Sequence, residues 1–133
     1  MQLSGRRKVI YGIGIDLIEV LRIEKILNKR YEPFTRKVYS SAEIDYCKKK
    51  PFPQIHFAAR FAAKESFLKA LGIGLGMGVS LTDIELINQM NEKPILKLHN
   101  KAKSIIIDEE IRSVQVSVSH TKNYAGAVVI LEK

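Results

Sequence analysis

The sequence predicts an α+β domain. Helical and strand-like segments follow one another without the regular strand–helix–strand repetition of an α/β protein, and the C-terminal segment has the pattern of an antiparallel hairpin. The chain has 133 residues, of which 46% are hydrophobic. This is enough for one domain with its own core. We therefore expect residues 1–133 to form a single domain.

The N-terminal half is predicted to begin with a strand that leads directly into a helix. Isoleucines alternate with glycines over residues 10–16, which is typical of a strand whose backbone is closely approached by another element. Apolar residues then recur at helical spacing over residues 18–29. Asp16 and Glu19 have the spacing of a capping pair, so we expect the strand to end near Asp16.

Two further helices are predicted in the middle of the chain. Ser40 and Glu43 form the pattern of a capping box before a short helix, which the prolines at 51 and 53 end. A long alanine-rich helix follows over residues 54–71, and glycines end it. The glycine-rich residues 72–78 lack the Gly-Lys-Ser/Thr of a phosphate-binding loop, so we interpret them as a plain loop.

The C-terminal half is predicted to contain mostly strands. Residues 84–87 and 95–98 have the pattern of two strands, and residues 101–107 that of a short helix. Valines alternate with polar residues over 114–118, and an apolar run follows over 125–131. The turn between them makes this segment a β-hairpin.

The charge predicts an anionic partner. Lys and Arg number 22 against 14 Asp and Glu, for a net charge of +8. Nucleic acid, phosphorylated cofactors and acidic proteins all fit this charge. A basic nucleic-acid-binding module is the alternative to an enzyme, but the chain has no Trp and no aromatic-rich strand pair of the kind that binds RNA.

The remaining composition predicts a cytoplasmic protein that does not span a membrane. The chain has one cysteine, Cys47, and so no internal disulfide. Its apolar runs are shorter than the about 18 residues of a membrane span, and the N-terminus lacks the pattern of a signal peptide.

Two carboxylates stand out as candidates for chemistry. Asp16 lies at the expected strand-to-helix corner, and Glu65 lies on the long helix. If they meet, a cation must lie between them, and Mg²⁺ favours one or two carboxylates together with substrate phosphates. The alternative is structural: Asp16 caps a helix, and Glu65 forms an ion pair with Lys69 four residues on.

Basic residues beside these acids are candidates for binding phosphate. Arg60 and Lys64 lie four residues apart on the long helix, and Lys69 follows Glu65 by four. A metal ion together with Lys and Arg side chains stabilises the charge on the transferring group, so this set of residues suits phosphoryl transfer. His120 follows the valine strand, where a histidine with only structural contacts is the alternative.

Three motifs together resemble those of the holo-acyl-carrier-protein synthases, the bacterial 4′-phosphopantetheinyl transferases. They are GIGIDLIEVLR at 12–22, FAARFAAKESFLKA at 57–70 and VSVSHTKNYA at 116–125. The resemblance covers residues 10–131. It implies the fold of that family, a mostly antiparallel sheet with a long helix packed on it, and Mg²⁺-dependent transfer of phosphopantetheine from coenzyme A to a serine of apo-acyl carrier protein. Adenosine 3′,5′-bisphosphate would be released, and the product would support fatty acid biosynthesis.

The resemblance also implies roles for individual residues. Asp16 and Glu65 would be the metal ligands, and Glu65, directly or through a metal-bound water, the base. Lys69 would steady the transferring phosphoryl group. The residues that would hold the rest of coenzyme A are Arg60, Lys64, His120 and Thr121.

The assembly and the second substrate follow from the same resemblance. Proteins of this length in the family typically form homotrimers with the active sites at subunit interfaces, and the valine strand would bury a face there. The helix that carries Arg22, Lys25 and Lys29 would dock the acidic carrier protein. Ser66 departs from the alanine common at this position, and its hydroxyl is a candidate phosphate contact.

Overall fold

The computed structural model describes residues 7–73, 78–88 and 93–133, and it has the α+β architecture that the sequence predicts. Strands form a three-stranded antiparallel sheet in the order β1–β5–β4 and a two-stranded antiparallel sheet, β2–β3. The elements are β1 (Ile10–Glu19), α1 (Val20–Val38), α2 (Ser41–Lys48), α3 (Pro53–Leu71), the 3₁₀ turn η2 (Leu81–Asp83), β2 (Ile84–Ile87), β3 (Ile95–Leu98), α4 (Asn100–Asp108), β4 (Ser113–His120) and β5 (Tyr124–Glu132).

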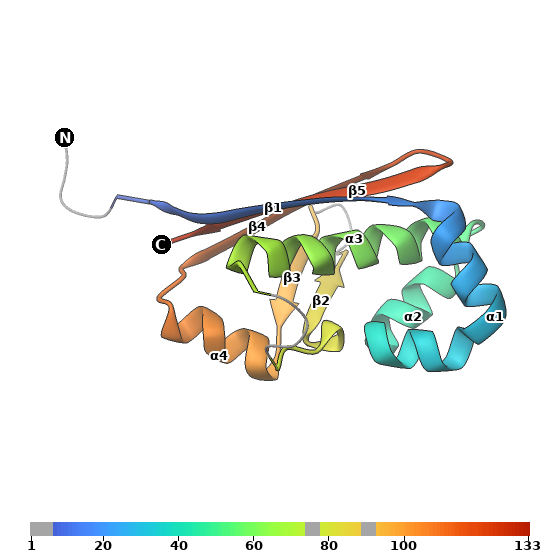
Figure 1. Ribbon diagram of the computed structural model, residues 1–133, viewed down its shortest axis with the longest axis horizontal. Helices are drawn as coiled ribbons and strands as arrows, with labels where there is room; N and C mark the ends of the chain where they lie inside the picture. Colours follow the sequence, from blue (N-terminus) through green and yellow to red (C-terminus); the bar gives the residue numbers. More distant parts are fainter. Residues whose placement is uncertain (1–6, 74–77, 89–92) are drawn as a thin grey trace.

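The long helix α3 is the centre of the fold. It lies lengthwise along the three-stranded sheet, with α1 and α2 near one end of the molecule and α4 near the other (Figure 1). Its main contacts are with β1 and β5, and its alanines and phenylalanines form much of the core. None of the helices in the described ranges is long and apolar enough to cross a membrane.

Two glycines allow α3 to lie directly on β1. A Cβ atom at Gly14 would overlap the carbonyl oxygen of Ser66 and would lie 2.7 Å from the amide nitrogen of Ala70. A Cβ atom at Gly12 would overlap the carbonyl group of Ala70. The predicted close approach to this strand is therefore confirmed, and the approaching element is the backbone of α3.

The prediction that β1 ends near Asp16 is wrong. The strand continues to Glu19, and Asp16 pairs with Ala127 of β5 in the middle of the ladder. Glu19 is the N-cap residue of α1 and makes no side-chain capping bond. Pairing with β5 keeps the backbone extended beyond the last glycine, so Asp16 and Glu19 do not form a capping pair.

The first helical segment of α1 ends after residue 29, as the sequence predicts. Arg30 has non-helical angles, φ −143° and ψ 51°, and a second helical segment, which was not predicted, follows this kink and runs to Val38. Pro33 lies in the first turn of the second segment, where a missing N–H costs no helical hydrogen bond. The break in the apolar periodicity thus marks the kink between the two segments.

The other predicted elements are confirmed to within one or two residues. The Ser40–Glu43 capping box has both of its hydrogen bonds. Gly72 ends α3 in the left-handed conformation, with φ 77°. In the loop predicted for residues 72–78, positions 74–77 lie outside the described residues.

The exposed apolar face of the sheet belongs to β1 and not to the valine strand. Val114, Val116 and Val118 are partly buried against the core. By contrast, Ile15 and Leu17 are 69% and 70% exposed on the opposite face of the sheet. The valines face inward because they lie on the face of β4 that is turned towards α3.

Candidate active site

Strand β1 and helix α3 bring Asp16 and Lys69 into contact. The Lys69 ammonium donates to Asp16 Oδ1 at 2.9 Å and to the carbonyl oxygen of Ile15 at 3.0 Å. The Asp16 side chain is 18% exposed and that of Lys69 is 54% exposed. The ion pair therefore lies at the surface, in a shallow polar site formed by residues 53 positions apart in the sequence.

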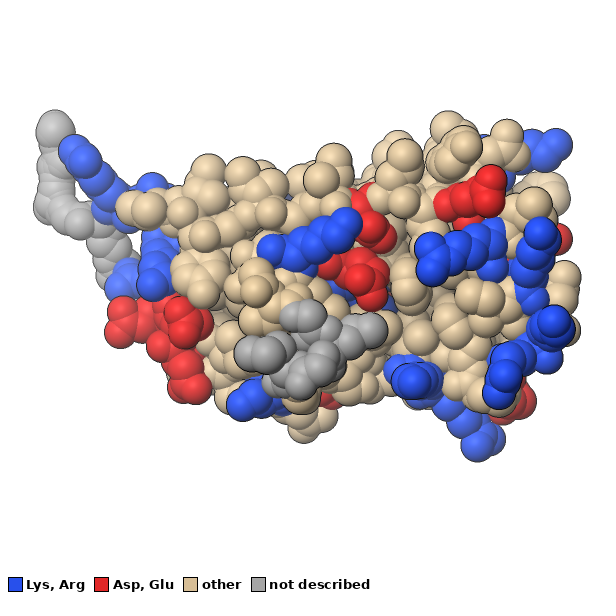
Figure 2. Space-filling model, in the orientation of Figure 1, with Lys and Arg blue, Asp and Glu red and all other residues tan. Residues whose placement is uncertain are grey.

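Glu65 lies in the same site, one turn before Lys69 on α3. Burial raises the pKa of Glu65, and the nearby Asp16 carboxylate raises it further, while Lys69 and Arg22 oppose the shift. Figure 2 shows Asp and Glu side chains near the middle of one face with Lys and Arg side chains on either side. The sequence prediction that Asp16 and Glu65 meet is thus supported by the electrostatic effect of one acid on the other.

The pair of carboxylates fits a magnesium ion that shares its coordination with a substrate. Mg²⁺ is bound by one or two carboxylates and by substrate phosphates. Within residues 7–73, 78–88 and 93–133, no three His, Cys, Asp or Glu side chains converge on one point. The site therefore offers Asp16 and Glu65 as oxygen ligands, with Lys69 beside them for phosphate charge.

The raised pKa of Glu65 predicts a pH-dependent cost in stability. The folded chain binds a proton at Glu65 more tightly than the unfolded chain does, so this group lowers the free energy of unfolding as the pH rises through its titration. In EDTA, Glu65→Gln is therefore expected to be more stable than the parent protein at pH 7, with the difference shrinking towards pH 4. Urea unfolding at both pH values measures this.

Glu19→Gln is the matched control, because Glu19 is an exposed acid on β1. It should change the free energy of unfolding by less than about 0.5 kcal/mol at either pH. A Glu65→Gln protein that is less stable than the parent at pH 7 would contradict the prediction.

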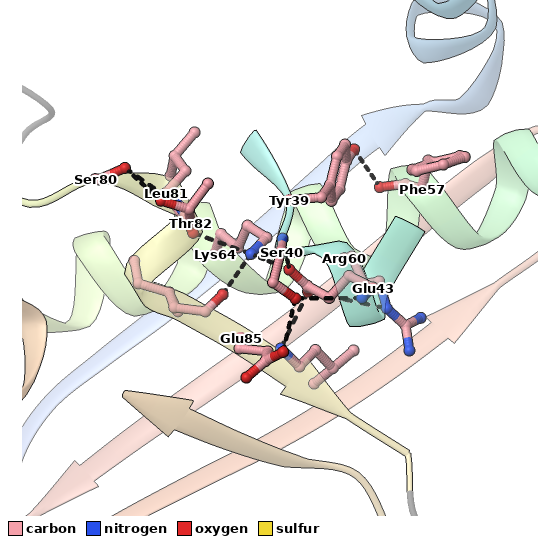
Figure 3. Close-up of polar contacts among 12 residues, drawn as sticks. Tyr39, Ser40, Glu43, Phe57, Arg60, Lys64, Ser80, Leu81, Thr82 and Glu85 are labelled. Carbon is pink, nitrogen blue, oxygen red and sulfur yellow. Dashed lines mark hydrogen bonds and ion pairs between the residues drawn. The ribbon is translucent and has the colours of Figure 1, made fainter. Parts of the chain in front are cut away.

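Lys64 does not lie in this site, and its predicted contact with coenzyme A is wrong. Its side chain is fully buried. The ammonium donates to Glu43 Oε1 at 2.7 Å, to the carbonyl oxygen of Leu81 at 3.0 Å and to that of Ile84 (Figure 3). All three N–H donors are occupied, so none is free for a phosphate.

Sequence analysis identified Glu43 only as a capping residue and missed its ion pair with Lys64. Its carboxylate also accepts from the amides of Ser40, at 3.0 Å, and Leu86, at 3.1 Å, so it ties α2 to α3 and β2. The capping-box pattern predicted the bond to Ser40, but no sequence signal linked Glu43 to Lys64, which is 21 residues away. A buried carboxylate of this kind is found only when the fold brings its partners together.

Arg60 lies next to this cluster and retains spare hydrogen-bonding capacity. Its Nη2 donates to Asn88 Oδ1 at 2.7 Å, and its Nε lies 3.9 Å from Glu43 Oε2 without forming a hydrogen bond to any described residue. Arg60 and Lys64 thus lie beside the carboxylate of Glu43. Burial lowers the pKa of Lys64, and Glu43 opposes this shift together with a second acid, Glu85. The Nε donor of Arg60 remains for a further acceptor.

His120 and Thr121 lie at the turn between β4 and β5. The His120 ring packs edge-on against His56 of α3, with centroids 5.7 Å apart. Burial lowers the pKa of His56, and His120, Lys50 and Arg60 lower it further. His56 was not predicted; its position four residues before Arg60 places it on the same side of α3. The Thr121 hydroxyl accepts from the amides of Asn123 and Tyr124, so it also shapes the turn.

The basic residues of α1 lie where the sequence predicts. Arg22, Lys25 and Lys29 are all exposed and precede the kink at Arg30. Arg22 also lies close enough to lower the pKa of Glu65. One end of this basic helix therefore adjoins the acidic pair.

Ser66 of α3 faces the three-stranded sheet. Its side chain is buried, and its hydroxyl donates to the carbonyl oxygen of Ala127 at 3.0 Å. The expectation of a phosphate contact is wrong, because Ser66 faces the sheet and its only proton is used there.

Comparisons with known proteins point to one family. The sequence pattern of the 4′-phosphopantetheinyl transferase superfamily matches residues 12–129. The holo-[acyl-carrier-protein] synthase of Syntrophus aciditrophicus is 55% identical over 124 residues, which cover 93% of this chain and 97% of that protein. The fold is similar to the crystal structure of the holo-[acyl-carrier-protein] synthase from Neisseria meningitidis, with a TM-score of 0.86 and 30% identity over 94% of this chain and all of that one.

A second solved structure was determined with a substrate of such enzymes. The Helicobacter pylori holo-[acyl-carrier-protein] synthase in complex with coenzyme A has a TM-score of 0.77 to this chain and is 35% identical, over 90% of this chain and 98% of that one. The sequence pattern, the relatives and the fold agree with one another. The chain therefore belongs to the 4′-phosphopantetheinyl transferase superfamily, as an enzyme of its holo-[acyl-carrier-protein] synthase family.

Proposed function

We propose that this enzyme transfers 4′-phosphopantetheine from coenzyme A to a serine of apo-acyl carrier protein in a Mg²⁺-dependent reaction that releases adenosine 3′,5′-bisphosphate. The convergence of Asp16, Glu65 and Lys69 in one surface site is the observation that carries this proposal. A bound Mg²⁺ would neutralise charge on the diphosphate of coenzyme A and so favour its cleavage.

The acids and Lys69 divide the chemistry between them. The serine hydroxyl attacks the phosphorus next to pantetheine, so one P–O bond forms while the bond to the bridging oxygen of the diphosphate breaks. Glu65 accepts the serine proton, directly or through a metal-bound water. The Lys69 ammonium stabilises the charge that spreads over the transferred group.

Arg60, His120 and Thr121 are proposed to hold the nucleotide end of coenzyme A. Arg60 brings a guanidinium whose Nε has no partner among the described residues, and the exposed His120 ring lies at the end of β4. We leave Lys64 out of this set and assign it to the buried ion pair with Glu43.

The exposed face of α1 is proposed to dock the carrier protein. Acyl carrier proteins are acidic, so Arg22, Lys25 and Lys29 offer complementary charge. An apolar groove of about 530 Å³ adjoins this helix, and exposed Leu21 and Phe52 lie along it. The groove lies where it could receive the apolar side chains of a carrier-protein helix docked on α1.

Reversal of one charge on α1 tests the docking face. Lys25→Glu is expected to raise the KM for carrier protein roughly three- to tenfold while the KM for coenzyme A changes less than about twofold, because a docking charge contacts one substrate. Lys25 is preferred to Arg22, which also acts on Glu65. Steady-state kinetics at low and high salt measure the effect, which should shrink as salt rises.

Lys103→Glu is the matched control for net charge, because Lys103 is exposed on α4. It should leave both KM values unchanged. Equal increases in the two KM values with Lys25→Glu would reject a role in docking.

A homotrimer is proposed as the working assembly. The outer face of β1 carries Ile13, Ile15 and Leu17, which are 57%, 69% and 70% exposed. Val128 and Ile130 of β5 pair with this strand and extend the apolar surface. A second copy of the chain would remove this surface from water.

The biological setting follows from the reaction. The chain would act as one transferase domain in the cytoplasm, where it would activate carrier protein for fatty acid biosynthesis. Residues 1–9 are treated as an N-terminal extension without a part in catalysis; of these, Val9 pairs with Lys133 beyond the end of β5.

Intact-mass spectrometry of apo-acyl carrier protein tests the proposal. Incubation with the enzyme, coenzyme A and Mg²⁺ should add the mass of phosphopantetheine, and EDTA should prevent the gain. The absence of any gain with folded enzyme and several carrier proteins would refute the proposed activity, and a gain in EDTA would refute its metal dependence.

A further inference from the structure

The Lys69 ammonium binds one of the two Asp16 carboxylate oxygens that a metal could use. Its nitrogen lies 2.9 Å from Asp16 Oδ1 and donates a second hydrogen bond to the carbonyl oxygen of Ile15. Mg²⁺ binds its oxygen ligands at about 2.1 Å. An ion on Asp16 Oδ1 would therefore lie no more than about 5 Å from the ammonium in this position, and the two cations would repel each other.

The Lys69 side chain can move away from Asp16, whereas the backbone of Asp16 is held in the sheet. The lysine side chain is 54% exposed and has a flexible four-carbon stem. Asp16 is 18% exposed and lies in the middle of the β1–β5 ladder, where its backbone is fixed. Lys69 is therefore the more mobile partner, and its movement is the simplest rearrangement that relieves the repulsion of a metal on Asp16.

We infer that Lys69 competes with the divalent cation for Asp16, and that binding of coenzyme A shifts the ammonium from Asp16 to a phosphate. This inference rests on the proposed function. Lys69 then has two successive positions: it neutralises Asp16 in the free chain and contacts phosphate in the complex. The free protein would bind metal weakly, and the metal would bind strongly only when phosphate oxygens arrive with it.

Mn²⁺ binding to the free protein tests the competition. Mn²⁺ favours the same oxygen ligands as Mg²⁺, and its EPR signal reports the unbound ion. Lys69→Met in the full chain without coenzyme A is expected to bind Mn²⁺ about tenfold more tightly than the parent protein, because both the competitor and its repulsion are gone. Lys69→Gln, which is polar but uncharged, should show the same tightening.

Two control variants separate competition from a general charge effect. Lys69→Arg keeps a cation beside Asp16 and should bind Mn²⁺ as weakly as the parent protein. Lys103→Met removes a positive charge from α4 and should also leave the affinity unchanged. Affinities of Lys69→Met and Lys69→Gln that equal or fall below that of the parent protein would overturn the inference.

The parent protein distinguishes this inference from the proposed function. If it modifies carrier protein only when Mg²⁺ is present, while Lys69→Met binds Mn²⁺ no more tightly, the inference alone fails. If it transfers nothing, or transfers equally well in EDTA, the proposed function itself fails.

Discussion

Replacement of Asp16 by alanine is expected to lower kcat/KM for phosphopantetheine transfer about 10³-fold or more, while the unfolding temperature stays within about 3 °C of the parent value. The substitution removes a proposed metal ligand and the partner of Lys69 but no large apolar surface. The lost ion pair is partly exposed, and such pairs contribute little to stability. Glu65→Ala is expected to have the same effect on transfer, because it removes both a metal ligand and the base.

Mass spectrometry of the carrier protein measures the transfer rate, and circular dichroism measures the unfolding temperature. Glu19→Ala is the matched control on the same strand: it removes an exposed acid and should leave the rate unchanged within about threefold. Transfer at the parental rate by a folded Asp16→Ala, Glu65→Ala double variant would exclude the metal site.

Gly14→Ala is expected to destabilise the fold more than any surface substitution, by about 3 kcal/mol or more, or to prevent folding. The added Cβ would overlap the Ser66 carbonyl oxygen and lie 2.7 Å from the amide nitrogen of Ala70. These are backbone atoms of a packed helix, so no side-chain rotation can make room. Helix α3 would have to move away from β1, and Glu65 would move away from Asp16.

Gly126→Ala is the control within the same sheet. A Cβ there would lie 3.5 Å from its nearest neighbours, which is an ordinary contact, so the free energy of unfolding should change by less than about 1 kcal/mol. Urea denaturation compares the two variants. An unchanged midpoint for Gly14→Ala would mean that α3 does not depend on the glycine at this position.

Local patterns predicted most of the elements. The capping box, the prolines before α3 and the alternating valines of β4 are short-range signals, and the structure has the corresponding elements. The end of β1 and the second helical segment of α1 could not be predicted in this way. The strand ends where its pairing with β5 ends, at Glu19 opposite Tyr124, and that partner is 105 residues away.

The site was predictable where the resemblance to a family supplied a long-range contact. Spacing alone left open whether Asp16 and Glu65 meet, and the motifs of the transferase family favoured their meeting. The prediction that Lys64 contacts coenzyme A was wrong. Lys64 belongs to the same motif as Glu65, but successive residues of a helix point in different directions. Membership of the family also removes the case for a nucleic-acid-binding module, which rested on net charge.

In the proposed trimer, the alternation of side chains along β1 would make turnover depend on the enzyme concentration. Asp16 faces α3, whereas its neighbours Ile15 and Leu17 face outward and are 69% and 70% exposed in the single chain. In the proposed trimer, each subunit would therefore hold a metal ligand on a strand whose other side rests on a neighbouring subunit. Dilution below the dissociation constant of the assembly should then reduce turnover per active site, and a dilution series with coenzyme A and carrier protein in excess would reveal it as a rate that falls faster than the protein concentration.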